Sequence, residues 1–139
     1  MKLISLLEKL EYTCLQGSTD QEVKNVIYDS RKVEEGSLFI CIRGAVVDGH
    51  KFVPDVVAKG AKVLIVEEAV EAPEDVTVIL VKDTRYAMAF ISAAYFGYPA
   101  EKLKTIGITG TKGKTTTTFM IKEILEKSGK KVGLIGTIA

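Results

Sequence analysis

An apolar stretch that begins at Thr105 enters a glycine-rich loop, and the loop opens a helical pattern at Lys114. Gly107, Gly110 and Gly113 stand three residues apart in this segment. Glycines let backbone N–H groups turn inward and approach an anion closely. The N-terminus of a helix adds unpaired donors and a partial positive charge. A strand, a loop and a helix in this order therefore predict a nucleotide-phosphate site in an α/β fold.

Two side chains at the end of the loop suit the chemistry of a bound nucleotide. Lys114 can reach the β- and γ-phosphates, and the Thr115 hydroxyl can ligate Mg²⁺. The usual pattern G-x-x-x-x-G-K-[ST] requires glycine where Ile108 stands, so the loop is a variant, and a glycine turn before an ordinary helix is the alternative. The threonine run 115–118 favours the phosphate site, because β-branched residues are poor helix formers. Thr116 is predicted to help hold phosphate, whereas packing and solvent exposure account for the last two threonines.

The rest of the chain alternates strand and helix patterns, which predicts the α/β class. Apolar residues at helical spacing predict an amphipathic helix over 1–10, marked by Leu3, Leu6, Leu7 and Leu10. Further helices are expected at 50–59, ending at Gly60; at 83–96, with Asp83 as N-cap; and at 114–128, burying Ile121, Ile124 and Leu125. Strands are expected at 24–28, 37–42, 62–66, 76–81, 105–109 and 131–135.

Charge divides the chain near Tyr98, Pro99 and Ala100. Residues 1–99 hold 11 Lys+Arg and 15 Asp+Glu, whereas residues 100–139 hold 8 and 3. A proline at the junction and a new motif just after it favour a domain boundary over a chance fluctuation. The strand–helix–strand piece after the boundary cannot complete a sheet by itself. We therefore expect a longer protein of which this is the front; the alternative is that this end docks onto the first domain.

Composition argues against several classes of protein. The net charge of +1 does not suit a general nucleic-acid binder. No apolar run approaches the ~18 residues of a membrane span. The first ten residues contain Glu8 and Lys9, lack a small-residue cleavage site and resemble a helix rather than a signal peptide. Cys14 and Cys41 form no CxxC pair, so we expect reduced, buried thiols in a cytosolic protein.

Two segments of the first part follow expected strands, at the place where α/β folds put their ligands. Tyr28-Asp29-Ser30-Arg31 either binds a ligand or only forms a turn. The loop 43–49 has an apolar middle, which could pack on a flat ring such as a base. His50, the single histidine, is more typical of a capping or packing residue than of a catalyst.

These motifs resemble those of the Mur ligases of bacterial cell-wall synthesis. One part of the resemblance is to their uridine-nucleotide domain, carried by Asp29-Ser30-Arg31-x-Val33-x-x-Gly36-x-Leu38-Phe39, by Arg43-Gly44-x-x-x-Asp48-Gly49-His50-x-Phe52 and by Gly60-Ala61. Thr109 to Thr117 is similar to the family's ATP loop, including its glycine spacing. Essentially the whole chain is covered. The resemblance implies a UDP-MurNAc-binding N-terminal α/β domain over 1–99 and, over 100–139, the first β-loop-α-β unit of a P-loop ATPase domain.

The resemblance also implies roles for individual residues. ATP is expected at Gly110, Thr111, Lys112, Gly113, Lys114, Thr115 and Thr116, with Lys114 as the catalytic residue on phosphate and Thr115 as the ligand of Mg²⁺. The uridine diphosphate part of the substrate is expected at Tyr28 and Ser30, and uracil at Ala45, Val46 and Val47. Several relatives have a histidine where Ala45 stands, so apolar packing is expected there without a specific hydrogen bond.

The implied reaction belongs to peptidoglycan precursor synthesis. ATP phosphorylates the free D-Glu carboxylate of UDP-MurNAc-L-Ala-D-Glu, and the amino group of a diamino acid, meso-diaminopimelate or L-lysine, attacks the acyl phosphate. The products are an amide, ADP and phosphate. Such catalysis by positioning and charge suits a phosphate loop with Mg²⁺. The Asp-Ser-Arg triplet favours members that add this third residue; members that add the D-Ala-D-Ala dipeptide, usually with Asp-Thr-Arg, are the alternative.

Two other functions are alternatives to the ligase. A folylpolyglutamate synthetase shares the ATP domain, but such enzymes begin near the phosphate loop, and residues 1–99 argue against one. A nucleotide-binding module without chemistry is the other. We expect a cytoplasmic monomer with no nucleic-acid or membrane partner. The resemblance further implies that residues 1–139 alone do not catalyse ligation, because the family's other substrate loops and third domain lie outside them.

Overall fold

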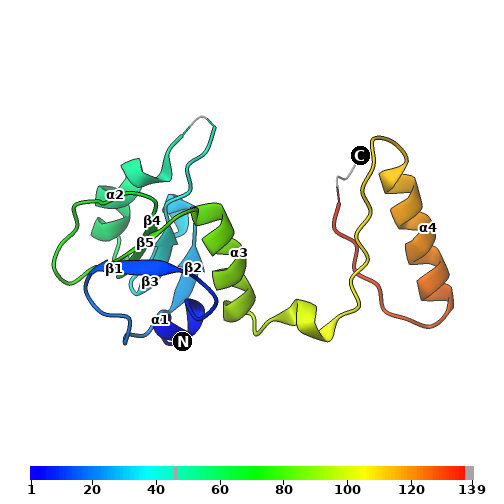
Figure 1. Cartoon of the computed structure of the whole chain (residues 1–139), viewed down its shortest axis with the longest axis horizontal. Coiled ribbons are helices and arrows are strands. Elements are labelled where there is room, and N and C mark those ends of the chain that lie inside the picture. Colours follow the sequence, from blue (N-terminus) through cyan, green and yellow to red (C-terminus); the bar gives the residue numbers. More distant parts are fainter. Residues whose placement is uncertain (46, 137–139) are drawn as a thin grey trace. The chain divides into compact units, whose positions relative to one another are not determined.

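The computed structural model describes residues 1–45 and 47–136, and the chain divides into two compact units, Met1–Lys102 and Leu103–Ala139 (Figure 1). The division follows a short 3₁₀ turn, η3 (Pro99–Lys102), just after the junction expected from charge. Tyr98 at this junction has a positive φ of 52°, and its hydroxyl donates to Glu8 Oε1 at 2.6 Å. The binding functions expected of the two parts stay predictions.

The first unit is built on a five-stranded sheet with the order β1-β5-β4-β3-β2. Its strands are β1 (Tyr12–Gln16), β2 (Asn25–Ile27), β3 (Ser37–Ile40), β4 (Val63–Val66) and β5 (Thr77–Val81). Neighbours from β2 to β5 are parallel, whereas β1 pairs antiparallel with β5 at the edge. Strands β2 to β5 confirm four expected strands, each slightly shorter than predicted. Strand β1 was not predicted from the sequence.

Helices cover both faces of this sheet. The helices are α1 (Leu3–Leu6), α2 (Val53–Ala58) and α3 (Thr84–Tyr95), with 3₁₀ turns η1 (Ser30–Lys32) and η2 (Gly49–Phe52). Helix α3 begins as predicted, because the Asp83 side chain accepts a hydrogen bond from the Tyr86 N–H. The helix expected over 1–10 is wrong in length. It ends after Leu6; Leu7 is its C-cap and is 1% exposed, and residues 12–16 form an edge strand.

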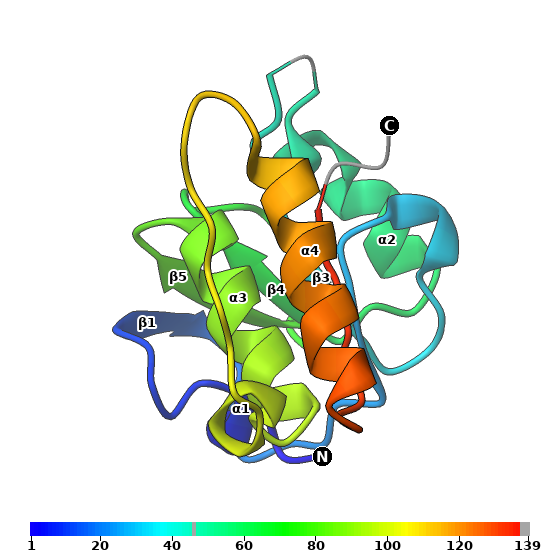
Figure 2. The ribbon, with the colours of Figure 1, turned by 90° about the vertical axis from the view of Figure 1, so that its right-hand side faces the viewer.

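Two apolar clusters hold the layers together. One joins α1 and α3 to one face of the sheet through thirteen buried residues, among them Leu3, Leu6, Ile65, Ala87 and Ile91. The other joins α2 to the opposite face through residues such as Phe39, Cys41, Val56 and Leu64. In Figure 2 helix α3 lies in front of strands β4 and β5, on the face away from α2. The unit is therefore a three-layer α/β/α sandwich.

The second unit contains helix α4 (Lys114–Lys127), which confirms the expected helix at this position. No strand occurs over 103–136, so the strands predicted at 105–109 and 131–135 are wrong as far as the structure describes them. A strand exists only through hydrogen bonds to a neighbour, and these short segments find none. The predicted burial on α4 is also wrong, because Ile124 is 66% exposed and no residue of the helix is buried.

Both cysteines are free, but only one of them is buried. Cys41 follows β3 in the core, and burial raises the pKa of its thiol to about 12. Cys14 lies on the edge strand β1 and is exposed, which corrects the prediction that both thiols are buried. Over the residues that the structure describes, none of the helices combines the length and the apolar character that a membrane crossing requires.

Candidate nucleotide-binding sites

The glycine-rich loop of the second unit forms an open bend into α4. Gly113 occupies the N-cap position with φ 76°, a left-handed conformation that glycine adopts without strain, and no side chain caps the helix. Gly110 also has a positive φ, of 150°. The residues from Gly110 to Thr116 are all exposed. No side chain therefore occupies the N–H groups of the first helical turn, and the predicted phosphate site stays a prediction.

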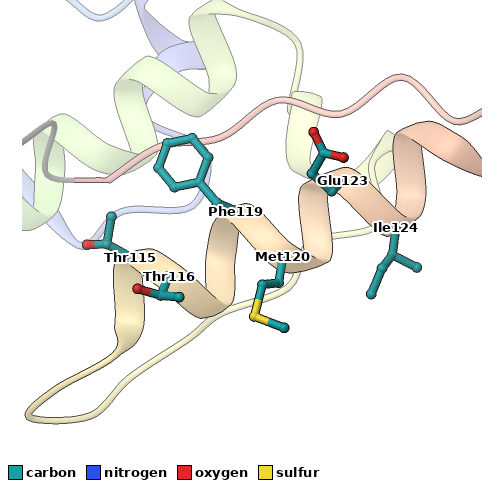
Figure 3. A pocket seen from close by; sticks show the side chains of 6 residues that line it. All are labelled: Thr115, Thr116, Phe119, Met120, Glu123 and Ile124. Carbon is teal, nitrogen blue, oxygen red and sulfur yellow. The ribbon is translucent and has the colours of Figure 1, made fainter.

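Lys114 and the threonines after it occupy the first turn of α4. The Lys114 ammonium folds back over the loop and donates to the Gly110 carbonyl. Thr118 Oγ1 donates to the Lys114 carbonyl at 2.7 Å, a bond within the helix that explains how this β-branched residue is accommodated. Figure 3 shows Thr115 and Thr116 at the head of a shallow, mostly apolar hollow along the helix, continued by Phe119, Met120, Glu123 and Ile124.

A second candidate site lies in the first unit, at the carboxyl ends of the parallel strands. After β2, Tyr28 is 67% exposed. Asp29 caps η1 and accepts hydrogen bonds from the backbone N–H of Arg31 (3.1 Å) and from its guanidinium (2.8 and 2.9 Å). The Arg31 guanidinium is the main reason that the pKa of Asp29 falls to about 2. The Asp29 carboxylate is therefore occupied in shaping the turn. Of the residues predicted to bind the substrate here, Tyr28 is exposed and Ser30 is half-buried.

The loop after β3 is closed at its base by an antiparallel bridge between Arg43 and Asp48. Inside the bridge the Gly44 N–H donates to the Val47 carbonyl at 2.9 Å. Ala45 and Val47 are both exposed, and Val47 leaves 48% of its surface in solvent. Val46, also expected to contact uracil, lies outside the described residues. Because β2 and β3 are parallel neighbours, the segments at 28–30 and 43–48 emerge from the same edge of the sheet.

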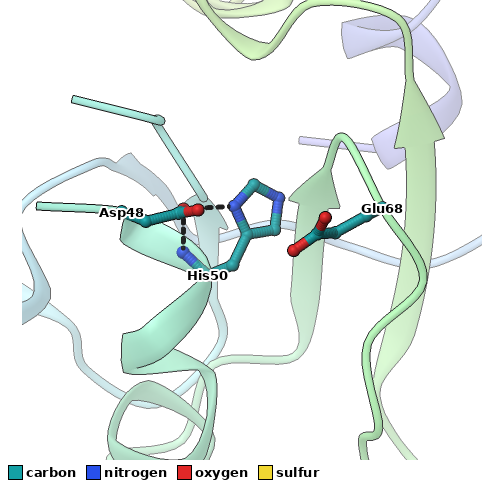
Figure 4. A group of neighbouring side chains, drawn as sticks. All are labelled: Asp48, His50 and Glu68. Atoms are coloured by element: carbon teal, nitrogen blue, oxygen red, sulfur yellow. Dashed lines mark hydrogen bonds and ion pairs between the residues drawn. The ribbon is translucent and has the colours of Figure 1, made fainter. Parts of the chain in front are cut away.

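His50 is buried and makes hydrogen bonds through both ring nitrogens. Figure 4 shows the contacts of its backbone N–H and its Nδ1 with Asp48. Its Nδ1 lies 2.6 Å from Asp48 Oδ1, and its Nε2 accepts the backbone N–H of Glu67 at 2.9 Å. Asp48, His50 and Glu68 have ligand atoms within 4.8 Å of one another. The imidazole nevertheless has no lone pair free for a metal, because both nitrogens are engaged. His50 is thus buried and bonded within the fold through both nitrogens, which fits the packing role expected for it.

Asp48 is the acceptor that organises the start of η2. The backbone and the ring of His50 donate to it, with a further bond from Arg43, and together they hold the pKa of Asp48 at about 2. Its ordinary value is 3.8, so the folded state prefers the carboxylate. The resulting stabilisation is complete above the unfolded pKa and is lost as pH falls toward about 2.

We therefore expect Asp48→Asn to flatten the acid limb of the stability profile. The unsubstituted chain should lose melting temperature between about pH 4 and pH 2, as Asp48 and Asp29 take up protons. The variant should start lower at pH 6 but lose less over that interval. All five tyrosines lie in the first unit, so tyrosine fluorescence measures its melting alone. An acid limb of unchanged slope in Asp48→Asn would contradict this account of the loop.

Sequence reasoning missed Glu67 as a partner in this cluster. Glu67 Oε1 accepts hydrogen bonds from the N–H and the hydroxyl of Thr84, each at 2.8 Å. Glu67 directly follows β4, so it stands at the carboxyl end of a buried parallel strand. The rule that singled out Tyr28 and the 43–49 loop would have singled out Glu67 as well.

Two family descriptions match the sequence. Residues 22–96 match the Mur ligase family, catalytic domain, which is more than half of the 139 residues. Residues 108–139 match the Mur ligase middle domain. The first match lies within the first unit, and the second match lies within the second unit.

Individual relatives are similar over most or all of the chain. It is 55% identical over 139 residues to the UDP-N-acetylmuramoyl-L-alanyl-D-glutamate--2,6-diaminopimelate ligase of Clostridium perfringens (strain 13 / Type A), covering 100% of this chain and 29% of the relative. MurF from Acinetobacter baumannii is similar in structure, with 34% identity, a TM-score of 0.70, and coverage of 91% of this chain and 27% of that one. MurF ligase from Thermotoga maritima in complex with ADP has 25% identity, a TM-score of 0.55, and coverage of 76% and 24%. The chain thus spans less than a third of the length of these relatives.

Proposed function

The chain belongs to the Mur ligase family, and on that premise we propose that it forms part of an ATP-dependent ligase that joins 2,6-diaminopimelate to UDP-N-acetylmuramoyl-L-alanyl-D-glutamate. The observation that carries the proposal is the 55% identity over all 139 residues to a ligase of that name. It also favours diaminopimelate over lysine as the third residue. The protein would act in the cytoplasm as a monomer, with the nucleotide-linked dipeptide and the diamino acid as its partners.

A ligase for the D-Ala-D-Ala dipeptide is the second candidate. It is favoured by the similarity in structure to MurF from Acinetobacter baumannii, at 34% identity. The first proposal has the stronger support, because the identity to the diaminopimelate ligase is higher and Ser30 stands where dipeptide-adding members usually have threonine.

ATP would bind at the glycine-rich loop, at the residues from Gly110 to Thr116. The open bend at Gly113 and the uncapped start of α4 support this assignment, as does the ADP bound to a relative with a similar fold. Lys114 would place its positive charge on the transferred phosphate. The exposed Thr115 hydroxyl suits Mg²⁺, a cation that takes one or two protein oxygens together with substrate phosphates. When bound, Mg²⁺ neutralises charge that develops on those phosphates.

The uridine nucleotide would bind at the carboxyl edge of the first unit. Ala45, Val46 and Val47 would contact uracil, while Tyr28 and Ser30 would contact the diphosphate. The exposure of Ala45 and Val47 and the parallel pairing of β2 with β3 support this placement. The D-Glu carboxylate of this substrate would attack the γ-phosphorus of ATP and release ADP. The amino group of diaminopimelate would then attack the acyl phosphate, forming the amide and releasing phosphate and a proton.

Calorimetry with the 139-residue chain tests the nucleotide assignment. We expect UDP-N-acetylmuramoyl-L-alanyl-D-glutamate to bind weakly but measurably, and the same sugar-dipeptide without UDP not to bind. Val47→Asp should weaken binding, because it sets a charge against an uncharged base, whereas Ala58→Asp on the exposed side of α2 should not. If no uridine nucleotide binds, the assignment of the first unit is wrong.

A further inference from the structure

The loop that carries Ala45 and Val47 is tied to the sheet through His50. Asp48, at the end of the loop, accepts from the His50 N–H at 3.0 Å and contacts His50 Nδ1 at 2.6 Å. On the far side of the ring, the Glu67 N–H lies 2.9 Å from Nε2. A backbone amide can only donate, so Nε2 must keep its lone pair and Nδ1 must carry the proton. The hydrogen bonds thus select a single neutral tautomer, with the ring fixed between the loop and β4.

The connection continues from Glu67 to the start of α3. Its carboxylate accepts hydrogen bonds from both the N–H and the hydroxyl of Thr84. Thr84 is fully buried at the first position of that helix. Arg43 adds a second brace at the base of the loop, donating to Asp48 Oδ2 at 3.2 Å and to Glu68 Oε2 at 3.0 Å. A continuous series of hydrogen bonds therefore joins the loop, the end of β4 and the N-terminus of α3.

We propose that His50 and Glu67 are positioning residues for the uridine-nucleotide substrate. They hold the exposed loop in the orientation in which Ala45 and Val47 face the ligand, although they are not themselves assigned a contact with it. The proposal rests on the proposed function of this loop. A loop ordered before binding does not have to be ordered by the ligand, and affinity rises accordingly. Without the hydrogen bonds of His50 and Glu67, only a fraction of the molecules would hold the loop in the binding orientation. The apparent dissociation constant would then rise by the inverse of that fraction.

Glu67 offers a matched pair of variants. Glu67→Ala removes the acceptor for Thr84 but leaves the backbone N–H that reaches His50. Glu67→Gln keeps a carbonyl oxygen that can accept both Thr84 donors, so it serves as the conservative rescue. His50→Phe keeps a buried ring and removes both ring hydrogen bonds. Lys51→Ala, an exposed neighbour on the same turn, is the control.

The measurement is the dissociation constant of UDP-N-acetylmuramoyl-L-alanyl-D-glutamate, taken well below the melting temperature of each variant. His50→Phe and Glu67→Ala should raise it about 10-fold, corresponding to a loop that is correctly placed in about a tenth of the molecules. Glu67→Gln and Lys51→Ala should stay within about twofold of the unsubstituted chain. Hydrogen exchange at the Gly44 amide, measured without ligand, should be faster in the two disruptive variants.

An unchanged dissociation constant in a folded Glu67→Ala variant, with a lowered melting temperature, would show a merely structural role and overturn the proposal. Equal weakening by Glu67→Gln and Glu67→Ala would also overturn it, since the rescue would have failed. If His50→Phe does not fold, the Glu67 pair decides the question alone. Absence of any uridine-nucleotide binding by the unsubstituted chain would instead overturn the proposed function, and this inference with it.

Discussion

Lys114→Ala, in a full-length ligase that contains this sequence, is expected to lower kcat about 10²–10³-fold. The transferred phosphoryl group gains little from covalent chemistry with the protein, so its stabilisation depends on positioned charge. Lys114 stands at the first position of α4, directly after the Gly113 bend, where its charge adds to that of the uncapped helix N-terminus. Steady-state turnover with saturating ATP and UDP-linked dipeptide measures the effect.

Two further variants separate charge from side-chain bulk and from effects on the helix. Lys114→Gln keeps most of the length without the charge and should be nearly as inactive as the alanine variant. Lys122→Ala removes a lysine from the same helix that pairs with Glu126 at 3.3 Å, and should keep near-normal turnover. Turnover of Lys114→Ala within tenfold of the unsubstituted enzyme would mean that the loop does not hold the reacting phosphate.

The sequence was most informative about the parallel strands. Strands β3 and β4 are buried along their whole length, and each appears in the sequence as a continuous apolar run beside a turn signal. Strand β1 has neither property, because four of its five residues are exposed. It exists through its antiparallel pairing with β5, more than sixty residues away, as in the pair Tyr12 and Val81. No local pattern encodes such a partner.

In the second unit, too, the element that needs no distant partner was predicted correctly, and the elements that need one were not. Helix α4 is specified locally and begins at Lys114 as predicted, since a helix makes its own hydrogen bonds. The segments at 105–109 and 131–135 have strand-like sequences but no neighbouring strand within 103–136. The same requirement for a partner explains why Ile124 remains exposed, although its spacing predicts a buried face.

In the candidate sites, the sequence predicted which segments take part, but not which residues contact one another. It placed both loops at strand ends and assigned His50 to packing. It did not reveal that Asp48 and Glu67 are the two partners of that ring, because Glu67 is brought there by the parallel pairing of β3 with β4.

Gly49→Ala is expected to destabilise the first unit by about 3 kcal/mol. A methyl group at Gly49 would lie 2.7 Å from the nitrogen and 2.8 Å from the oxygen of Ile42, which are backbone atoms in the segment after β3. These atoms cannot rotate away as the tip of a side chain can. The Gly49 N–H also donates to that same Ile42 oxygen at 2.9 Å, so relief of the clash would cost this hydrogen bond.

Gly49 lies between Asp48 and His50, so any shift of its backbone moves both members of the pair that braces the loop. Gly49→Ala should therefore weaken UDP-N-acetylmuramoyl-L-alanyl-D-glutamate binding as well as stability, even where the chain remains folded. Urea unfolding followed by tyrosine fluorescence gives the stability of the first unit, since all five tyrosines belong to it. Gly133→Ala, where the added carbon meets no heavy atom within 4 Å, is the matched control and should leave that transition unchanged. A Gly49→Ala transition within about 0.5 kcal/mol of the unsubstituted chain would mean that the segment after β3 can shift to accept a methyl group, and that the loop is less firmly fixed than its hydrogen bonds indicate.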